Sequence, residues 1–200
     1  MSLWSIVPAR GLAAGKSRLA GVLDPDERLA LNTLLLERAL AAIEAADGNL
    51  AHCIVVSAGA DALALAREKG AVPLKDPGEP GGLNAALEAA RHLARILGAT
   101  SLRVLAADLP DVSGAALVVL GAAVPPEGLA IVADKHGSGT NALMLPAASR
   151  FAFDFGEDSL ARHLAAARAL GAEPLVWHVP ELAFDLDSPE DYRQWQARKP

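Results

Sequence analysis

Strand-like and helix-like segments alternate along most of the 200-residue chain. Short apolar runs at 3–7, 53–57 and 102–107 are separated by longer amphipathic stretches, including 24–46 and 83–97. The run at 102–107 is almost continuously apolar, which is typical of a central parallel strand covered on both faces. Repeated strand–helix units predict an α/β fold with a largely parallel sheet. The length fits one domain.

The boundaries of the expected elements follow from periodicity and capping signals. Asp24-Pro25 and Ser188-Pro189 each place a capping residue before a proline, which is typical of a helix start. We predict helices over 24–46, 60–69, 83–97, 113–123 and 159–170, and another that begins at Ser188. We predict strands over 3–7, 53–57, 72–74, 102–107, 129–133, 142–145 and 174–179.

Charge and composition limit the partners of the chain. The formal net charge is −6 and no basic face offsets it, which argues against nucleic acid as a general partner. No apolar stretch is long enough to span a bilayer, and no secretory signal is visible. Cys53, the only cysteine, lies in a predicted core strand, so we expect a buried, unreactive thiol. We expect a cytoplasmic protein with small-molecule partners and no membrane partner.

The loop after the first strand, 8–19, combines glycines with cations. Gly11 and Gly15 allow the backbone to approach a ligand closely, and Arg10, Lys16 and Arg18 bring three positive charges to one point. This combination suits a polyphosphate. A solvated basic loop is the alternative interpretation.

Gly15-Lys16-Ser17 also invites comparison with the P-loop of nucleotide triphosphatases. That motif has a glycine five residues before the Gly-Lys pair, and the residue at that position here is Arg10. The motif also requires a helix that starts at the lysine, whereas Gly21 and Pro25 follow shortly after Lys16. A P-loop enzyme is therefore a weak alternative.

Three carboxylates are expected at the same edge of the sheet as this loop. Ligands of parallel sheets bind beyond the carboxyl ends of the strands, so the loops at 8–18, 76–82 and 108–111 should meet there. Asp108 ends a predicted central strand, and Asp185 and Asp187 point to one face if their segment is extended. Three converging carboxylates suit Mg²⁺. Alternatively, Asp108 is a turn residue and Asp187 is a capping or solvated carboxylate.

Several segments, in this order, resemble the guanylyltransferases of deazaflavin coenzyme biosynthesis. The similar segments are 7–19, which contains Lys16-Ser17-Arg18-Leu19, then 81–87, 107–110, 139–143, 155–163 and 184–191. These enzymes activate phosphoenolpyruvate, 2-phospho-L-lactate or 3-phospho-D-glycerate with GTP. The resemblance covers essentially the full chain; Arg10 departs from it, because the family often has lysine there.

The resemblance implies a fold and a set of functional residues. The fold is a single-domain three-layer sandwich with a mostly parallel mixed sheet, that of nucleotidyltransferases with a glycosyltransferase-A-like (nucleotide-diphospho-sugar transferase) fold. We expect one domain over 1–200, with a nucleotide-binding part at about 1–112 and an acceptor-binding part at about 113–200. The expected residues are Lys16, Arg18 and Asp108 for catalysis; Pro8, Arg10, Gly15, Lys16, Gly82, Leu83, Asn84 and Asp108 for GTP; Thr140, Gly156 and Ser159 for the acceptor; and Asp108, Asp185 and Asp187 for Mg²⁺.

The implied reaction joins GMP to the phosphate of a three-carbon acid and releases pyrophosphate. A phosphate monoester has a second pKa of about 6 and is mostly dianionic at neutral pH, so the nucleophile needs no general base. Arg162 and His163 share the face of Ser159, and either a substrate contact or a surface role is compatible with the pattern. Other sugar or molybdopterin nucleotidyltransferases, a glycosyltransferase and a nucleotide sensor without turnover remain alternatives. The apolar helices also allow a homodimer.

Overall fold

The computed structural model describes residues 2–78, 82–125 and 127–198, and seven strands within these ranges form one sheet. The strand order is β3-β2-β1-β4-β6-β5-β7. The strands are β1 (Leu3–Pro8), β2 (Cys53–Ser57), β3 (Val72–Lys75), β4 (Ser101–Leu105), β5 (Ala130–Ala133), β6 (Thr140–Pro146) and β7 (Leu175–Trp177). All neighbouring pairs are parallel except those of β6, which is antiparallel to both β4 and β5. The prediction of a mostly parallel mixed sheet is confirmed.

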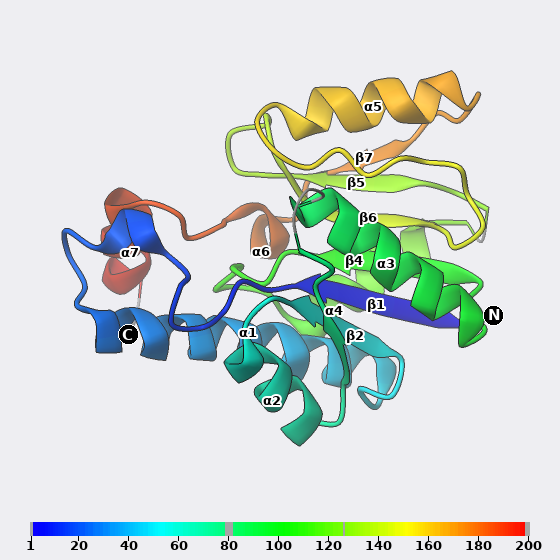
Figure 1. Cartoon of the computed structure of the whole chain (residues 1–200). Helices are drawn as coiled ribbons and strands as arrows, with labels where there is room; N and C mark the ends of the chain where they lie inside the picture. The colour runs from blue at the N-terminus through cyan, green and yellow to red at the C-terminus, as the bar shows by residue number, and fades with distance from the viewer. Residues whose placement is uncertain (1, 79–81, 126, 199–200) are drawn as a thin grey trace.

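Helices cover both faces of the sheet (Figure 1). They are α1 (Pro25–Asp47), α2 (Ala60–Glu68), α3 (Gly82–Ile96), α4 (Gly114–Ala123), α5 (Ser159–Ala169), α6 (Pro180–Ala183) and α7 (Pro189–Ala197), with a short 3₁₀ turn at Ser17–Leu19. Apolar residues of α1, α2 and α4 pack on one face, and those of α3 and α5 pack on the other. The predicted three-layer arrangement is therefore present. None of the helices in the described ranges is long and apolar enough to cross a membrane.

The capping signals in the sequence form as expected. Asp24 and Glu27 make a reciprocal capping box at the start of α1, and Ser188 and Asp191 make another at the start of α7. The predicted elements agree with the structure to within about two residues at each end, and α6 is an additional element. β7 is shorter than predicted, and α6 occupies residues 180–183. Pro180 stands at the first position of α6, where a missing N–H costs nothing.

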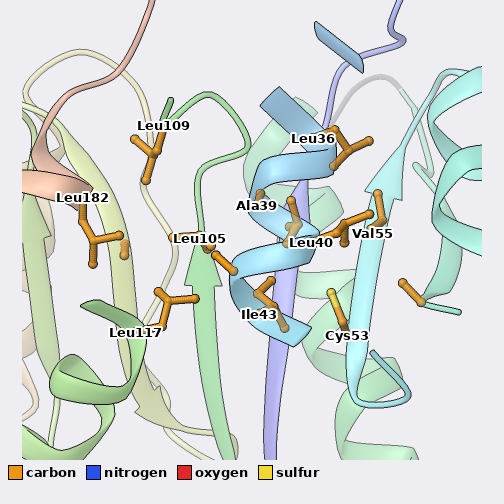
Figure 2. Packing of buried hydrophobic residues seen from close by; sticks show 14 of the residues in the cluster. Leu36, Ala39, Leu40, Ile43, Cys53, Val55, Leu105, Leu109, Leu117 and Leu182 are labelled. Carbon is orange, nitrogen blue, oxygen red and sulfur yellow. The ribbon is translucent and has the colours of Figure 1, made fainter. Parts of the chain in front are cut away.

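The sheet is buried between two apolar clusters. Figure 2 shows Leu36, Leu40 and Ile43 of α1 pointing towards Cys53 and Val55 of β2. Cys53 is fully buried, and this burial raises the pKa of its thiol to about 12. The expectation of a buried thiol is confirmed, and such a thiol stays protonated and weakly reactive at neutral pH.

A buried arginine interrupts the apolar pattern of the central strand β4. Arg103 is 1% exposed, and its Nη2 donates to Ser5 Oγ of β1 at 2.7 Å and to the Asp47 carboxylate at the end of α1. A buried charge is tolerated only when it is paired and hydrogen-bonded, and these partners meet that condition. β4 is thus central as predicted, but it is neither wholly apolar nor parallel to both of its neighbours.

A third apolar cluster joins the two ends of the chain. Phe184, Leu186 and Trp195 pack against Leu19 after the first loop and against Leu31 of α1. The Leu186 N–H also donates to the Asp108 carbonyl at 3.1 Å. This packing brings the segment 184–191 beside both the first loop and the end of β4.

Candidate active site

The loops predicted to meet at one edge of the sheet line a common cleft of about 1250 Å³. The cleft lies beyond the carboxyl ends of β1 and β4. Since β6 runs in the opposite direction, its first residue, Thr140, lies at the same edge. Pro8, Arg10, Gly15, Lys16, Arg18, Asp76, Leu83, Asp108, Thr140, Gly156, Ser159, Asp185 and Asp187 are among the lining residues. The predicted convergence is confirmed for these residues.

Two other parts of the chain hold the first loop in place. Asn32 of α1 donates from Nδ2 to the Leu12 carbonyl at 2.6 Å, and a Cβ on Gly15 would lie 2.6 Å from the same nitrogen. Gly59 packs so closely on Gly11 that a Cβ at residue 59 would collide with the Gly11 backbone. The glycines are therefore needed for close packing within the protein as well as for any approach of a ligand.

Lys16 occupies the centre of the cleft floor. Its Nζ lies 2.9 Å from Asp108 Oδ2 and 2.9 Å from Asp187 Oδ1, and only 9% of its side chain is exposed. Burial alone lowers the pKa of the Lys16 ammonium, but the charges of Asp108 and Asp187 outweigh burial and raise the pKa above its ordinary value. Lys16 is therefore a fixed positive charge at neutral pH.

Backbone strain coincides with this cleft at two positions. Lys16 has φ 55°, and Asp158, the N-cap residue of α5, has φ 52°. Within the described ranges, these are the non-glycine residues with positive φ. Such conformations cost about 1–2 kcal/mol per residue and are found preferentially at functional sites. One strained residue lies in the predicted nucleotide loop and the other in the predicted acceptor segment.

Asp108 and Asp187 fit a hard cation better than the predicted trio of carboxylates does. Both direct an oxygen at the Lys16 ammonium, so a single cation position lies between them. Oxygen donors of this type are the ligands that Mg²⁺ prefers. Among the described residues, no group of three or more His, Cys, Asp or Glu side chains is arranged to hold a metal ion. The Asp108–Asp187 pair thus fits a divalent ion once Lys16 moves away, and the three-ligand assignment stays a prediction.

Asp185 is directed towards a second lysine. Lys135 Nζ lies 3.5 Å from Asp185 Oδ1 and 2.6 Å from Asp191 Oδ1. Burial raises the pKa of the Asp185 carboxyl, and Lys135 opposes this shift only in part. Asp185 Oδ1 is buried and accepts no hydrogen bond within the described residues. The two carboxylates of the Asp-Leu-Asp segment therefore face different cations, Lys135 and Lys16.

Arg18 stands at the rim of the cleft. Its side chain is 79% exposed, and Nη1 lies 3.9 Å from Asp187 Oδ2. At this exposure the pair contributes little to stability. The Arg18 guanidinium is consequently available to an anion that enters the cleft.

The predicted guanine-binding segment opens α3. Gly82 starts the helix with φ 55°, and Leu83 is 44% exposed and lines the cleft. Asn84 is differently engaged, since its Nδ2 donates to the Phe155 carbonyl at 3.2 Å and its Oδ1 accepts from the Phe155 N–H at 2.8 Å. Its side chain thus anchors the loop before α5 at Phe155, and a direct contact with guanine stays a prediction. Gly81 of the same motif lies outside the described residues.

The three predicted acceptor residues come from two elements and the loop before one of them. Thr140 begins β6, Ser159 begins α5, and Gly156 lies in the loop before α5. Thr140 is 7% exposed and Ser159 is 2% exposed, yet both line the cleft. Gly156 adopts φ 138°, a conformation that L side chains rarely adopt. At the start of α5 the Ser159 N–H donates to the Gly156 carbonyl at 3.3 Å and the Leu160 N–H to the Ser138 carbonyl at 2.9 Å. The positive end of the helix dipole still favours an anion there.

His163 of α5 is fully buried behind Thr140 and the loop before α5. Its Nδ1 lies 3.0 Å from Thr140 Oγ1, and its Nε2 accepts from the Asp154 N–H at 3.0 Å. The surface role that the sequence allowed for His163 is excluded by this burial. Arg162, its neighbour, stays more exposed and pairs with Asp154 at 3.2 Å.

We expect the buried His163 to make the protein less stable in acid. Burial lowers the pKa of the His163 imidazole to about 4, with Asp154 opposing this shift and Arg162 adding to it. In the unfolded chain the ordinary value is about 6.5, so between about pH 6.5 and pH 4 the unfolded state binds more protons. The free energy of unfolding should therefore fall by up to about 3 kcal/mol as the pH falls through this window.

Urea denaturation at about pH 7 and about pH 4.5 measures this loss. His163→Phe should reduce the difference in the free energy of unfolding between the two pH values. His92→Gln, which changes an exposed histidine, should leave this difference as in the wild type. An equal acid loss in His163→Phe and the wild type would contradict the assignment.

Sequence reasoning did not identify the residues that support the site. Asn32, Gly59 and Lys135 hold the loop and the carboxylate segment, and Arg91 donates to the Ser149 and Phe151 carbonyls at 3.2 and 2.7 Å. Lys135 could have been found from its position, because it stands just after the carboxyl end of β5. The others lie in helices or loops where polar residues are ordinary.

Solved structures define the class of the fold. A nucleotidyl transferase from a Methanothermobacter species superposes with a TM-score of 0.74 at 18% identity, covering 98% of this chain and 96% of that one. A Mycobacterium tuberculosis protein, solved as a complex with manganese, superposes with a TM-score of 0.62 at 19% identity over 100% of both chains. The fold is therefore that of the nucleotidyltransferases and nucleotide-diphospho-sugar transferases.

Comparison of sequences identifies the family. The model of the family described as "Guanylyl transferase CofC like" matches residues 3–195. The phosphoenolpyruvate guanylyltransferase of Sphaerobacter thermophilus is 38% identical over 100% of this chain and 95% of its own length. That of Rubrobacter xylanophilus is 40% identical over 98% and 95%. The chain belongs to the CofC-like guanylyl transferase family, and it is an enzyme of the nucleotidyltransferase class.

Proposed function

We propose that this protein transfers GMP from GTP to the phosphate of phosphoenolpyruvate, in a Mg²⁺-dependent reaction that serves deazaflavin coenzyme biosynthesis. An oxygen of the acid's phosphate forms a bond to the α-phosphorus of GTP. The bond from that phosphorus to the oxygen that bridges to the β-phosphate breaks, and pyrophosphate leaves. The phosphate monoester is already mostly dianionic, since its second pKa is about 6, and no protein base is required.

One observation supports this proposal: the charged residues around Lys16 and the polar residues Thr140 and Ser159 line a single cleft. Lys16, between Asp108 and Asp187, lies on the floor, while Thr140 and Ser159 line the cleft from β6 and α5. A reaction between two polyanions needs this arrangement, because catalysis depends on positioning and charge neutralisation.

Different residues of the chain bind the two substrates. Lys16 and Arg18 neutralise the β- and γ-phosphates and the pyrophosphate that leaves. Leu83 lines the cleft at the start of α3, and the backbone of Gly82 and Leu83 binds guanine there. The α5 N-terminus, with Ser159 and Thr140, holds the phospho-acid.

The metal assignment rests on the chemistry of the carboxylates. Asp108 and Asp187 would hold the ion, with Asp185 as the predicted third ligand. When bound, Mg²⁺ supplies charge neutralisation and polarisation at the α-phosphate. The two aspartates share one cation position in the protein itself, which supports the assignment.

Phosphoenolpyruvate is the proposed acceptor because the relatives from S. thermophilus and R. xylanophilus carry that name. 2-Phospho-L-lactate and 3-phospho-D-glycerate differ from it by a double bond, or by a hydroxyl and the position of the phosphate. One or two pocket contacts suffice for such discrimination.

Mass spectrometry of the products tests the proposal directly. The enzyme is incubated with GTP, Mg²⁺ and the three acids in competition, and the GMP adducts are separated by mass. We expect the phosphoenolpyruvate adduct to dominate, with stoichiometric pyrophosphate. A preference for CTP or UTP, or GTP binding without pyrophosphate release with any acid, would overturn the proposal.

A further inference from the structure

His163 lies behind the proposed acceptor site without entering it. The side chain is fully buried, and the rings of Phe151 and Phe155 surround it at centroid distances of 5.4 and 4.7 Å. The cleft is lined by Thr140 and Phe155, with His163 in the layer beneath. Any influence of His163 on a ligand must therefore pass through one of these neighbours.

The two hydrogen bonds of His163 fix its tautomer. The Asp154 backbone N–H can only donate, and it lies 3.0 Å from Nε2, so Nε2 carries no hydrogen. A neutral imidazole then has its hydrogen on Nδ1. Nδ1 lies 3.0 Å from Thr140 Oγ1, so the imidazole donates and the threonine oxygen accepts.

The direction of the Thr140 hydroxyl follows from this donation. Within the described residues, His163 is the sole hydrogen-bonding partner of Thr140 Oγ1. A hydroxyl has one hydrogen and two lone pairs, and here a lone pair is occupied by His163. The hydroxyl hydrogen thus remains available, and Thr140 lines the cleft beside Ser159 and Gly156.

We infer that His163 is a positioning residue that forces the Thr140 hydroxyl to act as a hydrogen-bond donor to an anionic oxygen of the acceptor. This inference rests on the proposed function and deepens it. Phosphate and carboxylate oxygens only accept hydrogen bonds, so a donor attracts them and a lone pair repels them. With the other tautomer, whose Nδ1 carries no hydrogen, the Thr140 hydroxyl would donate to His163 and turn a lone pair towards the anion.

The acceptor segment is fixed so that this orientation is maintained. Asn84 binds both backbone groups of Phe155, and His163 binds the N–H of Asp154. The ring of His163 cannot flip by half a turn without losing both of its bonds. His163 therefore couples the position of the segment to the direction of one hydroxyl.

The tautomer is tested without any substrate. In protein labelled with ¹⁵N at histidine, long-range proton–nitrogen correlation spectra at neutral pH should show a protonated Nδ1 and an unprotonated Nε2 for His163. The signal is assigned by its loss in His163→Phe. An Nε2–H tautomer would overturn the inference.

A double-mutant cycle tests the coupling to the acceptor. Thr140→Val should weaken the apparent affinity for phosphoenolpyruvate by about tenfold or more, because a charge-assisted hydrogen bond is lost, and Thr140→Ser should restore it. His163→Phe should raise the KM for the acid by about tenfold, with the KM for GTP unchanged. In the Thr140→Val background, His163→Phe should have no further effect on the acid.

Asn84→Ala is the matched control, because it releases the same segment and has no hydrogen bond to Thr140. Its effect on the KM for the acid should be the same in both backgrounds. If His163→Phe also raises the KM for the acid by the same factor in both backgrounds, its role is structural and the inference is wrong.

The cycle is repeated by calorimetric binding of phosphoenolpyruvate, which needs no turnover. If the effects of His163→Phe and Thr140→Val on acid binding are coupled but no GMP is transferred, the proposed function is overturned and the role of His163 is supported. If GMP is transferred but the effects of the two substitutions on acid binding are additive, only the role of His163 is overturned. A protein that neither binds the acid nor transfers GMP would overturn both.

Discussion

Asp108→Asn is expected to reduce GTP-dependent pyrophosphate release by about 10³-fold. Asp108 Oδ2 holds the Lys16 ammonium at 2.9 Å, and the same carboxylate is a proposed ligand of the metal. An amide keeps the shape but removes the negative charge, so it weakens both roles. The backbone bond from Leu186 to the Asp108 carbonyl is retained in this variant, which keeps the segment 184–191 in place.

The measurement is a pyrophosphate-release assay at saturating GTP and acid, accompanied by thermal unfolding. Asp111→Asn serves as the control, because Asp111 lies three residues further along the same loop and pairs at 3.1 Å with Arg198 at the surface. The control should retain activity, and both variants should unfold near the wild-type temperature. Full activity in a folded Asp108→Asn protein would exclude Asp108 from the chemistry.

Lys16→Met is expected to have two opposite effects. Turnover should fall by about 10²- to 10³-fold, because the leaving pyrophosphate loses a buried positive charge. Binding of Mn²⁺ to the nucleotide-free protein should strengthen by about tenfold or more, because the ammonium that occupies the position between Asp108 and Asp187 is gone. A metal ion at the proposed site would have to displace this ammonium in the wild type.

Electron paramagnetic resonance of free Mn²⁺ during a titration measures the second effect. Lys75→Met is the matched control: it removes one positive charge from the carboxyl end of β3, where Lys75 donates to the Ala58 carbonyl at 2.6 Å. The control should bind Mn²⁺ as the wild type does. Unchanged Mn²⁺ affinity in Lys16→Met would show that the ammonium does not compete for the aspartate pair.

The sequence predicted which loops meet at the cleft, because the positions of strand ends are set by topology. Alternating strands and helices favour parallel neighbours, and the ends of the parallel strands β1 and β4 bring Lys16 and Asp108 to one edge. Thr140 reaches the same edge because β6 runs in the opposite direction. Asp187 needed a further step. Its position depends on the apolar packing of Phe184 and Leu186 against the first loop, and on the short helix α6 before them.

Pairing between side chains was less accessible to sequence reasoning. Lys16 has a positive φ and its ammonium contacts two carboxylates, and no local sequence pattern predicts that backbone conformation. Asn84 has the same donor and acceptor as a backbone amide, so it can bind either guanine or the Phe155 backbone; the structure shows the latter contact. The buried ion pair of Arg103 could not be predicted from the apolar run around it, because its partner Asp47 is distant in sequence.

The packing of residues 184–195 against the first loop has a consequence for the newly made chain. The sheet order places β1 to β4 side by side, so this part of the sheet can begin to form before the rest of the chain emerges from the ribosome. Asp187, the second carboxylate that holds Lys16, is supplied only when the segment that contains Phe184 and Trp195 has been translated. A partly synthesised chain would therefore present an incomplete charge arrangement, and catalytic competence would arise late in biogenesis.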